Sequence, residues 1–303
     1  MKKIFILFFL FNFCFSTKIF AKILLRIIGG NIVTEKKYPW IGSLMYKDRR
    51  EHFCGSSLIA DGWLVTAAHC VKSQSYSNTR AFLNILDKNE NNEGEIEIFI
   101  DEIIPHEQYN GSTYVNDIAL LKLTETSKNK IKDLNVEKVK LISTEQIGVL
   151  DKAEAPVTVA GWGKTDEYAP EYDYSPILLE ADLQIRGQED CISDYSINNI
   201  FDSSICAYDP TWWKDSCTGD SGGPLFAKND QEEILIGIVS WAEGCAQPGF
   251  PGVYARVSSF LNWIEEKTGI DFSQENNSQS FTETHIFNPG WHLFSLPGKF
   301  FEK

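Results

Sequence analysis

Short apolar runs separated by turn residues make up most of this chain. From Ile27 to Val257 these runs alternate with Gly, Asn, Asp and Ser, and apolar positions rarely repeat with a helical period. The pattern is typical of an all-β sandwich or barrel. A domain of about 245 residues, residues 27–271, is long enough to bury such a core.

Helical periodicity occurs near the end of this domain. Apolar side chains fall at i, i+3, i+4 and i+7, at Val257, Phe260, Leu261 and Ile264. This spacing predicts an amphipathic C-terminal helix. Gly269 stands where a glycine commonly ends a helix.

Residues 1–21 are typical of a secretion signal. Lys2 and Lys3 precede an apolar run that is shorter than the roughly 20 residues needed to cross a membrane. Cleavage is predicted after Ala21, cleavage after Ser16 is the alternative, and a retained signal anchor is a third possibility. We therefore expect a secreted protein, either extracellular or periplasmic.

The C-terminal segment, residues 272–303, differs in composition from the domain before it. A polar linker, residues 273–280, leads to an apolar, β-like stretch that is too short to bury its own core. This tail could dock on the domain, pair with a partner or be the remnant of a longer domain. The sequence leaves its role open.

The charge of the chain is strongly acidic. Removing residues 1–26 takes away five basic residues and no acidic one, which moves the formal net charge from −14 to −19. An acidic surface disfavours nucleic acid and anionic membranes as partners. We expect neither partner, and we expect a monomer.

Seven cysteines become six when Cys14 leaves with the signal. Six cysteines in an exported chain indicate disulfides, and 15 pairings are possible. A metal site is the rival interpretation, but the Cys-x-x-Cys spacing of many metal sites does not occur. We expect no metal and no required cofactor.

The candidate chemistry lies in three separate motifs. Ser221 stands in the Gly-rich run Asp-Ser-Cys-Thr-Gly-Asp-Ser-Gly-Gly-Pro, and a serine hydroxyl needs a base to become a good nucleophile. His69 ends an apolar, strand-like run, and Asp117 opens another. The order His, Asp, Ser is one known arrangement of an acyl-transfer triad.

With these motifs the chain resembles the trypsin/chymotrypsin family of serine proteases, from about Ile27 to Gly269. The resemblance implies two antiparallel β-barrels with the active site between them. Ser221 would be the nucleophile, His69 the general base and Asp117 the residue that orients the imidazole. The amides of Gly219 and Ser221 would form the oxyanion hole, and the segment from Ala155 to Gly163 would enter the second barrel.

The resemblance also implies the substrate. Asp215, six residues before Ser221, corresponds to the acid at the base of a trypsin-like pocket, so cleavage after Arg or Lys is expected. Ser240 and Trp241 would align the substrate, and Gly252 would leave the pocket open. One departure is Ala242, which stands where the trypsin pattern has glycine and should narrow the pocket mouth.

Activation by proteolysis is a further implication of the resemblance. Residues 22–26 would be an activation propeptide, with cleavage after Arg26 by a trypsin-like protease or by the protein itself. The new ammonium of Ile27 would insert beside Asp220 and order the oxyanion loop. The precursor should therefore be nearly inactive.

The family pattern pairs the six cysteines as Cys54–Cys70, Cys191–Cys206 and Cys217–Cys245. It also places an acidic loop near the position where several relatives bind calcium, with the acids Asp87, Glu90, Glu93 and Glu95. The spacing differs from the trypsin loop, which favours a solvated acidic loop over a structural calcium site.

Two alternatives remain open. A catalytically idle binding module would keep the fold and bind without cleaving, and Ala242 is its best support. A highly selective activator protease would cleave few substrates, because the long acidic loop from Asp166 to Asp173 restricts access.

Overall fold

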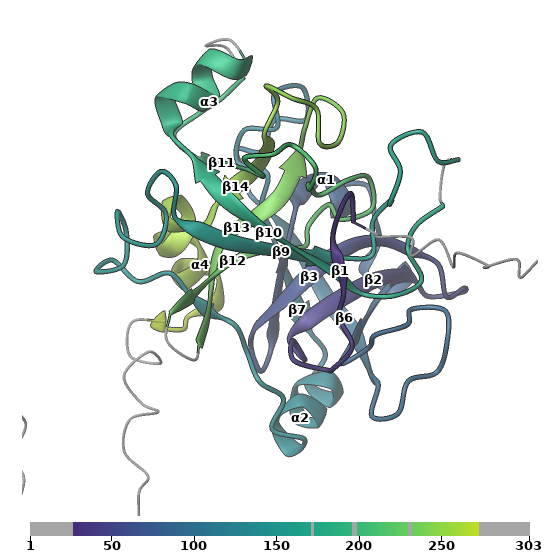
Figure 1. The fold of residues 1–303 in the computed structure, drawn as a ribbon. Helices are drawn as coiled ribbons and strands as arrows, with labels where there is room; N and C mark the ends of the chain where they lie inside the picture. Colours follow the sequence, from purple (N-terminus) through teal and green to yellow (C-terminus); the bar gives the residue numbers. More distant parts are fainter. Residues whose placement is uncertain (1–26, 171–172, 196–198, 230–231, 273–303) are drawn as a thin grey trace, which may run out of the picture.

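The structure is a computed structural model that describes residues 27–170, 173–195, 199–229 and 232–272. The predicted secretion signal, Arg26 and the linker with its tail lie outside these residues. Figure 1 shows an almost entirely β body with short helices at its periphery. The predicted all-β architecture is therefore confirmed.

The first barrel is closed and antiparallel, with the strand order β2-β3-β4-β7-β6-β5. Its strands are β2 (Ile41–Tyr46), β3 (His52–Ala60), β4 (Trp63–Thr66), β5 (Thr79–Leu83), β6 (Ile96–Pro105) and β7 (Ala119–Leu123). All four residues of β4 are buried, which explains why the sequence there is a continuous apolar run.

The second barrel is closed by the pairing of β9 with β10, in the order β9-β10-β11-β14-β13-β12. Its strands are β9 (Pro156–Gly161), β10 (Leu179–Arg186), β11 (Ser204–Tyr208), β12 (Pro224–Asn229), β13 (Glu232–Trp241) and β14 (Gly252–Arg256). Along β10 buried apolar residues alternate with more exposed ones, as a strand with one face in the core requires. The predicted strand within Ala155 to Gly163 is β9.

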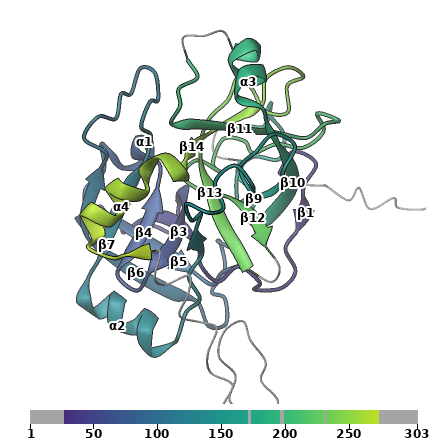
Figure 2. The ribbon, with the colours of Figure 1, turned by 90° about the vertical axis from the view of Figure 1, so that its left-hand side faces the viewer.

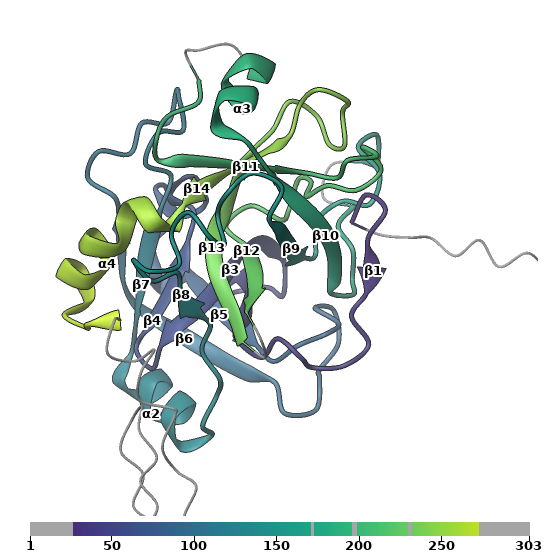
Figure 3. The same cartoon turned by 60° about the vertical axis from the view of Figure 1, so that its left-hand side comes forward.

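Two short strands extend the second sheet. β1 (Asn31–Ile32) pairs with β10, and β8 (Lys140–Leu141) pairs in parallel with β13. Figure 3 shows β8 beside β13, in the segment that connects the two barrels.

The predicted C-terminal helix is confirmed as a 3₁₀ turn, η2 (Val257–Phe260), followed by α4 (Leu261–Thr268). Val257, Phe260 and Ile264 are buried, and Gly269 ends the helix with a φ of +69°. Figure 2 shows α4 beside β7, so the last helix of the chain covers the first barrel. Within the described residues, no helix is long and apolar enough to cross a bilayer.

Four further helical segments were not predicted. They are α1 (Ala68–Val71), η1 (Tyr76–Asn78), α2 (Glu125–Asp133) and α3 (Gln188–Tyr195). In α2 only Ser127 and Ile131 are buried, so its sequence carries almost no apolar stripe. Its start is marked instead by Thr124, whose side chain accepts a hydrogen bond from the Ser127 amide.

The two barrels meet through close backbone contacts and aromatic packing. The ring of Phe226 on β12 packs edge-on against Trp40, with 5.3 Å between centroids. A Cβ on Gly55 would lie 2.7 Å from the backbone of Gly223, so the backbones touch here because neither residue has a side chain. This contact lies next to Ser221 in the sequence.

Candidate active site

His69 and Asp117 are brought together by the pairing of β4 with β7. Thr66 at the end of β4 lies opposite Ala119 at the start of β7. His69 follows three residues after Thr66, on the short helix α1, and Asp117 precedes Ala119 by two residues. Because the strands are antiparallel, both side chains come from the same edge of the barrel.

Two hydrogen bonds join these residues. The Nδ1 atom of His69 donates to Asp117 Oδ2 at 2.7 Å, and the His69 amide donates to Asp117 Oδ1 at 2.8 Å. Asp117 is buried, whereas the imidazole is partly exposed. The carboxylate therefore fixes the ring and leaves Nε2 available to accept a proton from the cleft side.

Ser240 provides a third contact to Asp117. Its hydroxyl donates to Asp117 Oδ2 at 2.5 Å. The pairing of β13 with β14 is irregular between Val239 and Trp241, that is, at Ser240. A bulge of this kind redirects a side chain, and here it turns the Ser240 hydroxyl toward the other barrel.

Ser221 lies on the turn that enters β12 and is held against the barrel that carries His69. Its carbonyl accepts a 2.8 Å hydrogen bond from the amide of Gly55. The next residue, Gly222, has a φ of +77°, and a Cβ there would lie 2.2 Å from Thr66 Oγ1. The glycine lets the Ser221 turn approach the end of β4, three residues from His69.

The loop before Ser221 is shaped by Gly219, which has a φ of +100°. A Cβ on this residue would lie 2.9 Å from the ring of Tyr174 and 3.0 Å from Gly163. The Gly219 carbonyl accepts a 2.8 Å hydrogen bond from His52 Nε2. These contacts hold the loop in place. Its backbone conformation at Gly219 would be strained for a residue with a side chain.

Asp220 is buried behind the same loop. One carboxylate oxygen accepts from the Gly163 amide at 2.8 Å, and the other accepts from the Cys217 amide at 2.9 Å. Burial raises the pKa of Asp220 to about 6, against the effect of these two bonds. The site therefore disfavours the carboxylate even with the positive charge of Lys88 nearby.

Ile27 and Ile28 lie beside this region. The side chain of Ile27 is fully buried, and Ile28 forms an isolated antiparallel bridge with Asp215. The first described residues are therefore packed against the segment that carries the pocket residues.

Asp215 is buried, with only one carboxylate oxygen engaged. Oδ2 accepts a 2.9 Å hydrogen bond from the Ala246 amide, while Oδ1 has no hydrogen-bond partner among the described residues. Burial raises the pKa of Asp215 to about 7. An unpaired buried carboxylate oxygen is costly, so this one favours a hydrogen-bond donor or a cation beside it.

Gly252 lies next to that oxygen. A Cβ on Gly252 would lie 3.0 Å from Asp215 Oδ1, so glycine keeps the approach to the acid free. The hydroxyls of Ser216 and Tyr254 lie 3.1 Å apart. Of the predicted residues, Trp241 is the last residue of β13 and Ala242 follows it, and both are partly exposed.

The structure contains the three expected disulfides, Cys54–Cys70, Cys191–Cys206 and Cys217–Cys245. One joins β3 to the helix that carries His69, and another joins the loop of Ser221 to the loop of Ala246. The sulfurs of Cys54 and Cys70 lie within 4.8 Å of a ring nitrogen of His69. Because the disulfide leaves neither cysteine as a thiolate, this group does not fit a metal ion.

Four residues of the site were missed by the sequence reasoning. His52 is buried between the hydroxyl of Ser43 and the carbonyl of Gly219, and burial lowers its pKa to about 3, so it is neutral. Tyr174 packs beside His52, and the buried ammonium of Lys88 lies over the Tyr174 ring. Tyr114 packs edge-on against the ring of His69. Of these four residues, Tyr114 could have been suspected from the sequence, because it stands three positions before Asp117.

Comparisons with known proteins place most of this chain in one family. The sequence profile of the Trypsin family matches residues 27–264. The chain is 36% identical over 244 residues to Trypsin-1 of Astacus astacus, and the match covers 79% of this chain and 98% of that protein.

Two further relatives are longer than the region they share with this chain. The chain is 33% identical over 268 residues to Urokinase-type plasminogen activator of Gallus gallus, covering 85% of this chain and 60% of the relative. It is 36% identical over 243 residues to Transmembrane protease serine 7 of Mus musculus, covering 80% of this chain and 28% of the relative. The chain therefore spans 60% of the first of these relatives and 28% of the second.

Proposed function

The chain belongs to the trypsin family of serine proteases, and we propose that it is a secreted endopeptidase, made as an inactive precursor, that cleaves after Arg or Lys. The relatives support the serine protease chemistry. The substrate preference, the activation step and the export of the protein are the parts that this proposal adds.

In this proposal Ser221 attacks the carbonyl of the scissile bond and transfers its proton to His69 Nε2. Asp117 holds the imidazole through Nδ1 and stabilises the imidazolium. His69 then gives the proton to the leaving amine, which leaves an acyl-enzyme. Water hydrolyses the ester by the same route, with His69 again as base. The 2.7 Å contact between His69 and Asp117 supports these roles.

The amides of Gly219 and Ser221 stabilise the oxyanion that forms during each attack. Each such donor contributes about 3 kcal/mol to the transition state. The positive φ of Gly219 and the bond from His52 to its carbonyl support this assignment, because they fix the loop before substrate binds.

The observation that carries the substrate preference is the unpartnered Oδ1 of Asp215 in a buried setting. A guanidinium or ammonium that entered past Gly252 would give this oxygen its missing partner. A carboxylate in a site of this kind favours Arg and Lys over neutral side chains. Ala242 narrows the pocket mouth in this proposal, which makes the enzyme selective between the two.

Activation is proposed to follow cleavage after Arg26 by a trypsin-like protease or by the enzyme itself. The freed amine of Ile27 adds a positive charge for buried Asp220, which the nearby charge of Lys88 favours only in part. The burial of Ile27 and the bridge from Ile28 to Asp215 support a coupling between this terminus and the pocket. The three disulfides support folding in an oxidising compartment, hence secretion.

The test is hydrolysis of fluorogenic peptides that end in Arg, Lys, Phe or Ala, using protein cut after Arg26. Uncut protein and Ser221→Ala serve as controls. Cleavage after Arg or Lys that is lost in both controls is the expected result. Faster cleavage after Phe would refute the pocket assignment.

No turnover of any peptide would contradict the proposal of a general endopeptidase. Labelling with a fluorophosphonate would then separate two remaining possibilities. A labelled Ser221 indicates a protease that accepts few sequences, and an unlabelled one indicates an idle binding module.

A further inference from the structure

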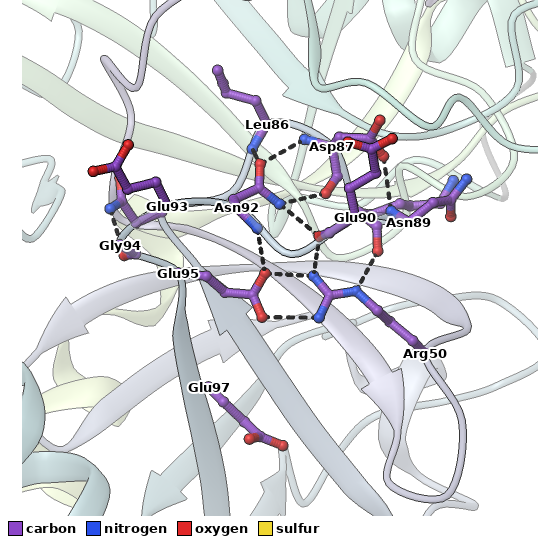
Figure 4. Close-up of polar contacts among 12 residues, drawn as sticks. Arg50, Leu86, Asp87, Asn89, Glu90, Asn92, Glu93, Gly94, Glu95 and Glu97 are labelled. Carbon is purple, nitrogen blue, oxygen red and sulfur yellow. Dashed lines mark hydrogen bonds and ion pairs between the residues drawn. The ribbon is translucent and has the colours of Figure 1, made fainter.

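The acidic loop of residues 87–97 is folded around a single arginine from another part of the chain. Arg50 stands in the hairpin between β2 and β3, and its side chain reaches into the loop (Figure 4). The loop connects β5 to β6 and belongs to no strand until Ile96. It is therefore shaped by side-chain contacts rather than by a sheet.

The guanidinium of Arg50 makes four hydrogen bonds to this loop. Nε donates to the Lys88 carbonyl at 2.7 Å, and Nη2 donates to the Glu90 carbonyl at 2.8 Å. The carboxylate of Glu95 accepts from Nη1 at 2.8 Å and from Nη2 at 2.5 Å. The pair with Glu95 is the bidentate fork that binds a carboxylate most strongly.

Asn92 holds the loop in the shape that Arg50 binds. Its side-chain oxygen accepts from the amides of Leu86 and Asp87 at 3.0 and 3.1 Å. Its Nδ2 donates to the carbonyls of Asp87 and Glu90 at 2.6 and 2.9 Å. The backbone thus curls around Asn92, and the Glu90 carbonyl is shared between Asn92 and Arg50.

The charge pair is shielded from water. The side chain of Glu95 is 14% exposed and that of Arg50 is 25% exposed, and the guanidinium lies 4.5 Å from the centre of the Phe82 ring. Burial by itself would raise the pKa of Glu95, but the hydrogen bonds from Arg50 and Asn92 outweigh it and hold this pKa below its usual value. Both groups are therefore charged and paired.

The residues present do not fit a calcium ion at this position. Calcium requires six to eight oxygen ligands at about 2.3–2.6 Å. The loop oxygens that converge, from Lys88, Glu90 and Glu95, already bind the positive guanidinium. The carboxylates of Glu93 and Glu97 point away from it in Figure 4, and Glu97 pairs with Arg80. Glu90 and Glu93 are exposed, as expected for a solvated acidic loop, whereas Glu95 pairs with Arg50.

We propose that Arg50 supplies the positive charge at the centre of this loop. Its guanidinium takes the role of a metal ion, so the fold does not depend on calcium. The loop is linked to the second barrel through Lys88, whose amide donates to the Pro176 carbonyl at 2.9 Å and whose ammonium donates to the Ser175 carbonyl. Arg50 therefore fixes an element that supports the segment behind Gly219.

The experiment uses the full chain with Ser221→Ala, so that neither self-digestion nor catalytic activity affects the result. Calcium chloride is titrated into this protein by calorimetry, and Tm is measured with calcium and with EDTA. Tm is then compared between Arg50→Gln and Arg49→Gln. Arg49 is the matched control because, among the described residues, its exposed side chain pairs with Glu51 and packs on Tyr46 without reaching the acidic loop.

We expect no calcium binding and the same Tm in both solutions. Arg50→Gln should lower Tm by about 5 °C or more, because it leaves Glu95 as an unpaired, shielded charge. Arg49→Gln should change Tm by about 2 °C at most. Stoichiometric calcium binding that raises Tm would overturn the proposal, as would equal stability of the two variants. If Arg50→Gln does not fold, the calorimetric titration still decides the question.

Discussion

The amide of Gly55 donates a 2.8 Å hydrogen bond to the carbonyl of Ser221, so one backbone bond links the first barrel to the residue proposed as nucleophile. These residues are 166 positions apart in the sequence. The bond sets the distance between the barrels at the point where His69 and Ser221 must meet. The alignment of the proposed triad would therefore depend on backbone contact as well as on the three side chains.

Substitution of Gly55 by Ala should impair catalysis, because the new Cβ would lie 2.7 Å from the backbone of Gly223 and push the barrels apart. A displacement of this size is expected to reduce kcat/KM by about 10- to 100-fold. Gly62→Ala is the control, since its Cβ would meet only Lys128 at 3.5 Å. Equal activity of both variants would show that the contact between barrels does not position Ser221.

The sequence was sufficient to predict the fold class and the residues of the proposed triad. His69, Asp117 and Ser221 stand in motifs whose residue types are dictated by local chemistry, so they are visible without a structure. The strand pattern was visible because each strand has a buried face.

What could not be predicted depends on partners that are distant in the sequence. His52 contacts Gly219 across 167 positions, and Arg50 contacts Glu95 across 45. Neither residue lies in a pattern that differs from an ordinary polar turn or strand. The helix α3 was missed for a related reason, because Cys191 is its only buried residue.

The hydrogen bond from Ser240 to Asp117 should contribute to catalysis without being essential. Ser240→Ala leaves Asp117 buried with two donors from His69 and one acceptor site unfilled. The loss of one hydrogen bond to a charged group, about 1.5 kcal/mol, corresponds to a fall in kcat of about tenfold. Asp117→Asn should reduce kcat far more, by about 10⁴-fold, because the imidazole is then held in the wrong tautomer.

Steady-state kinetics of the cut enzyme with an Arg peptide would measure both effects. Thr124→Ala, a cap substitution on the distant helix α2, is the control for small losses of stability. If Ser240→Ala and Asp117→Asn reduced kcat equally, the carboxylate would not act mainly through the tautomer of His69.

Binding of a cationic ligand in the pocket should weaken below neutral pH. Burial raises the pKa of Asp215 to about 7, so the carboxyl group is largely neutral in acid and cannot pair with a cation. The inhibition or dissociation constant of a small amidine should therefore rise by about tenfold for each pH unit below that value.

Calorimetric binding of the amidine to His69→Ala measures this effect without the imidazole at position 69. Asp215→Ser should bind the amidine weakly at every pH. A dissociation constant that stays the same from neutral to acidic pH would show that Asp215 is not the group that holds the cation.

Cleavage after Arg26 should stabilise the protein most near neutral pH. Burial raises the pKa of Asp220 to about 6, against the effect of the nearby Lys88 charge, so the carboxylate forms only above this pH. A free amine on Ile27, with an ordinary pKa of about 8, can pair with it. Pairing raises the pKa of the amine, so its stabilising effect is present at lower pH and disappears as pH rises through the raised value.

The two titrations together predict a bell-shaped effect. The comparison is between the Tm of cut protein and that of uncut protein, both carrying Ser221→Ala. The difference should be largest between the two pKa values. It should shrink in acid, where Asp220 is neutral, and in alkali, where the amine is neutral. Asp220→Asn should abolish the difference at every pH. Scanning calorimetry across this range measures it, and a constant difference would mean that cleavage stabilises the protein without forming this ion pair. Acetylation of the Ile27 amine should remove the difference in Tm at any pH, because the acetylated amine carries no positive charge.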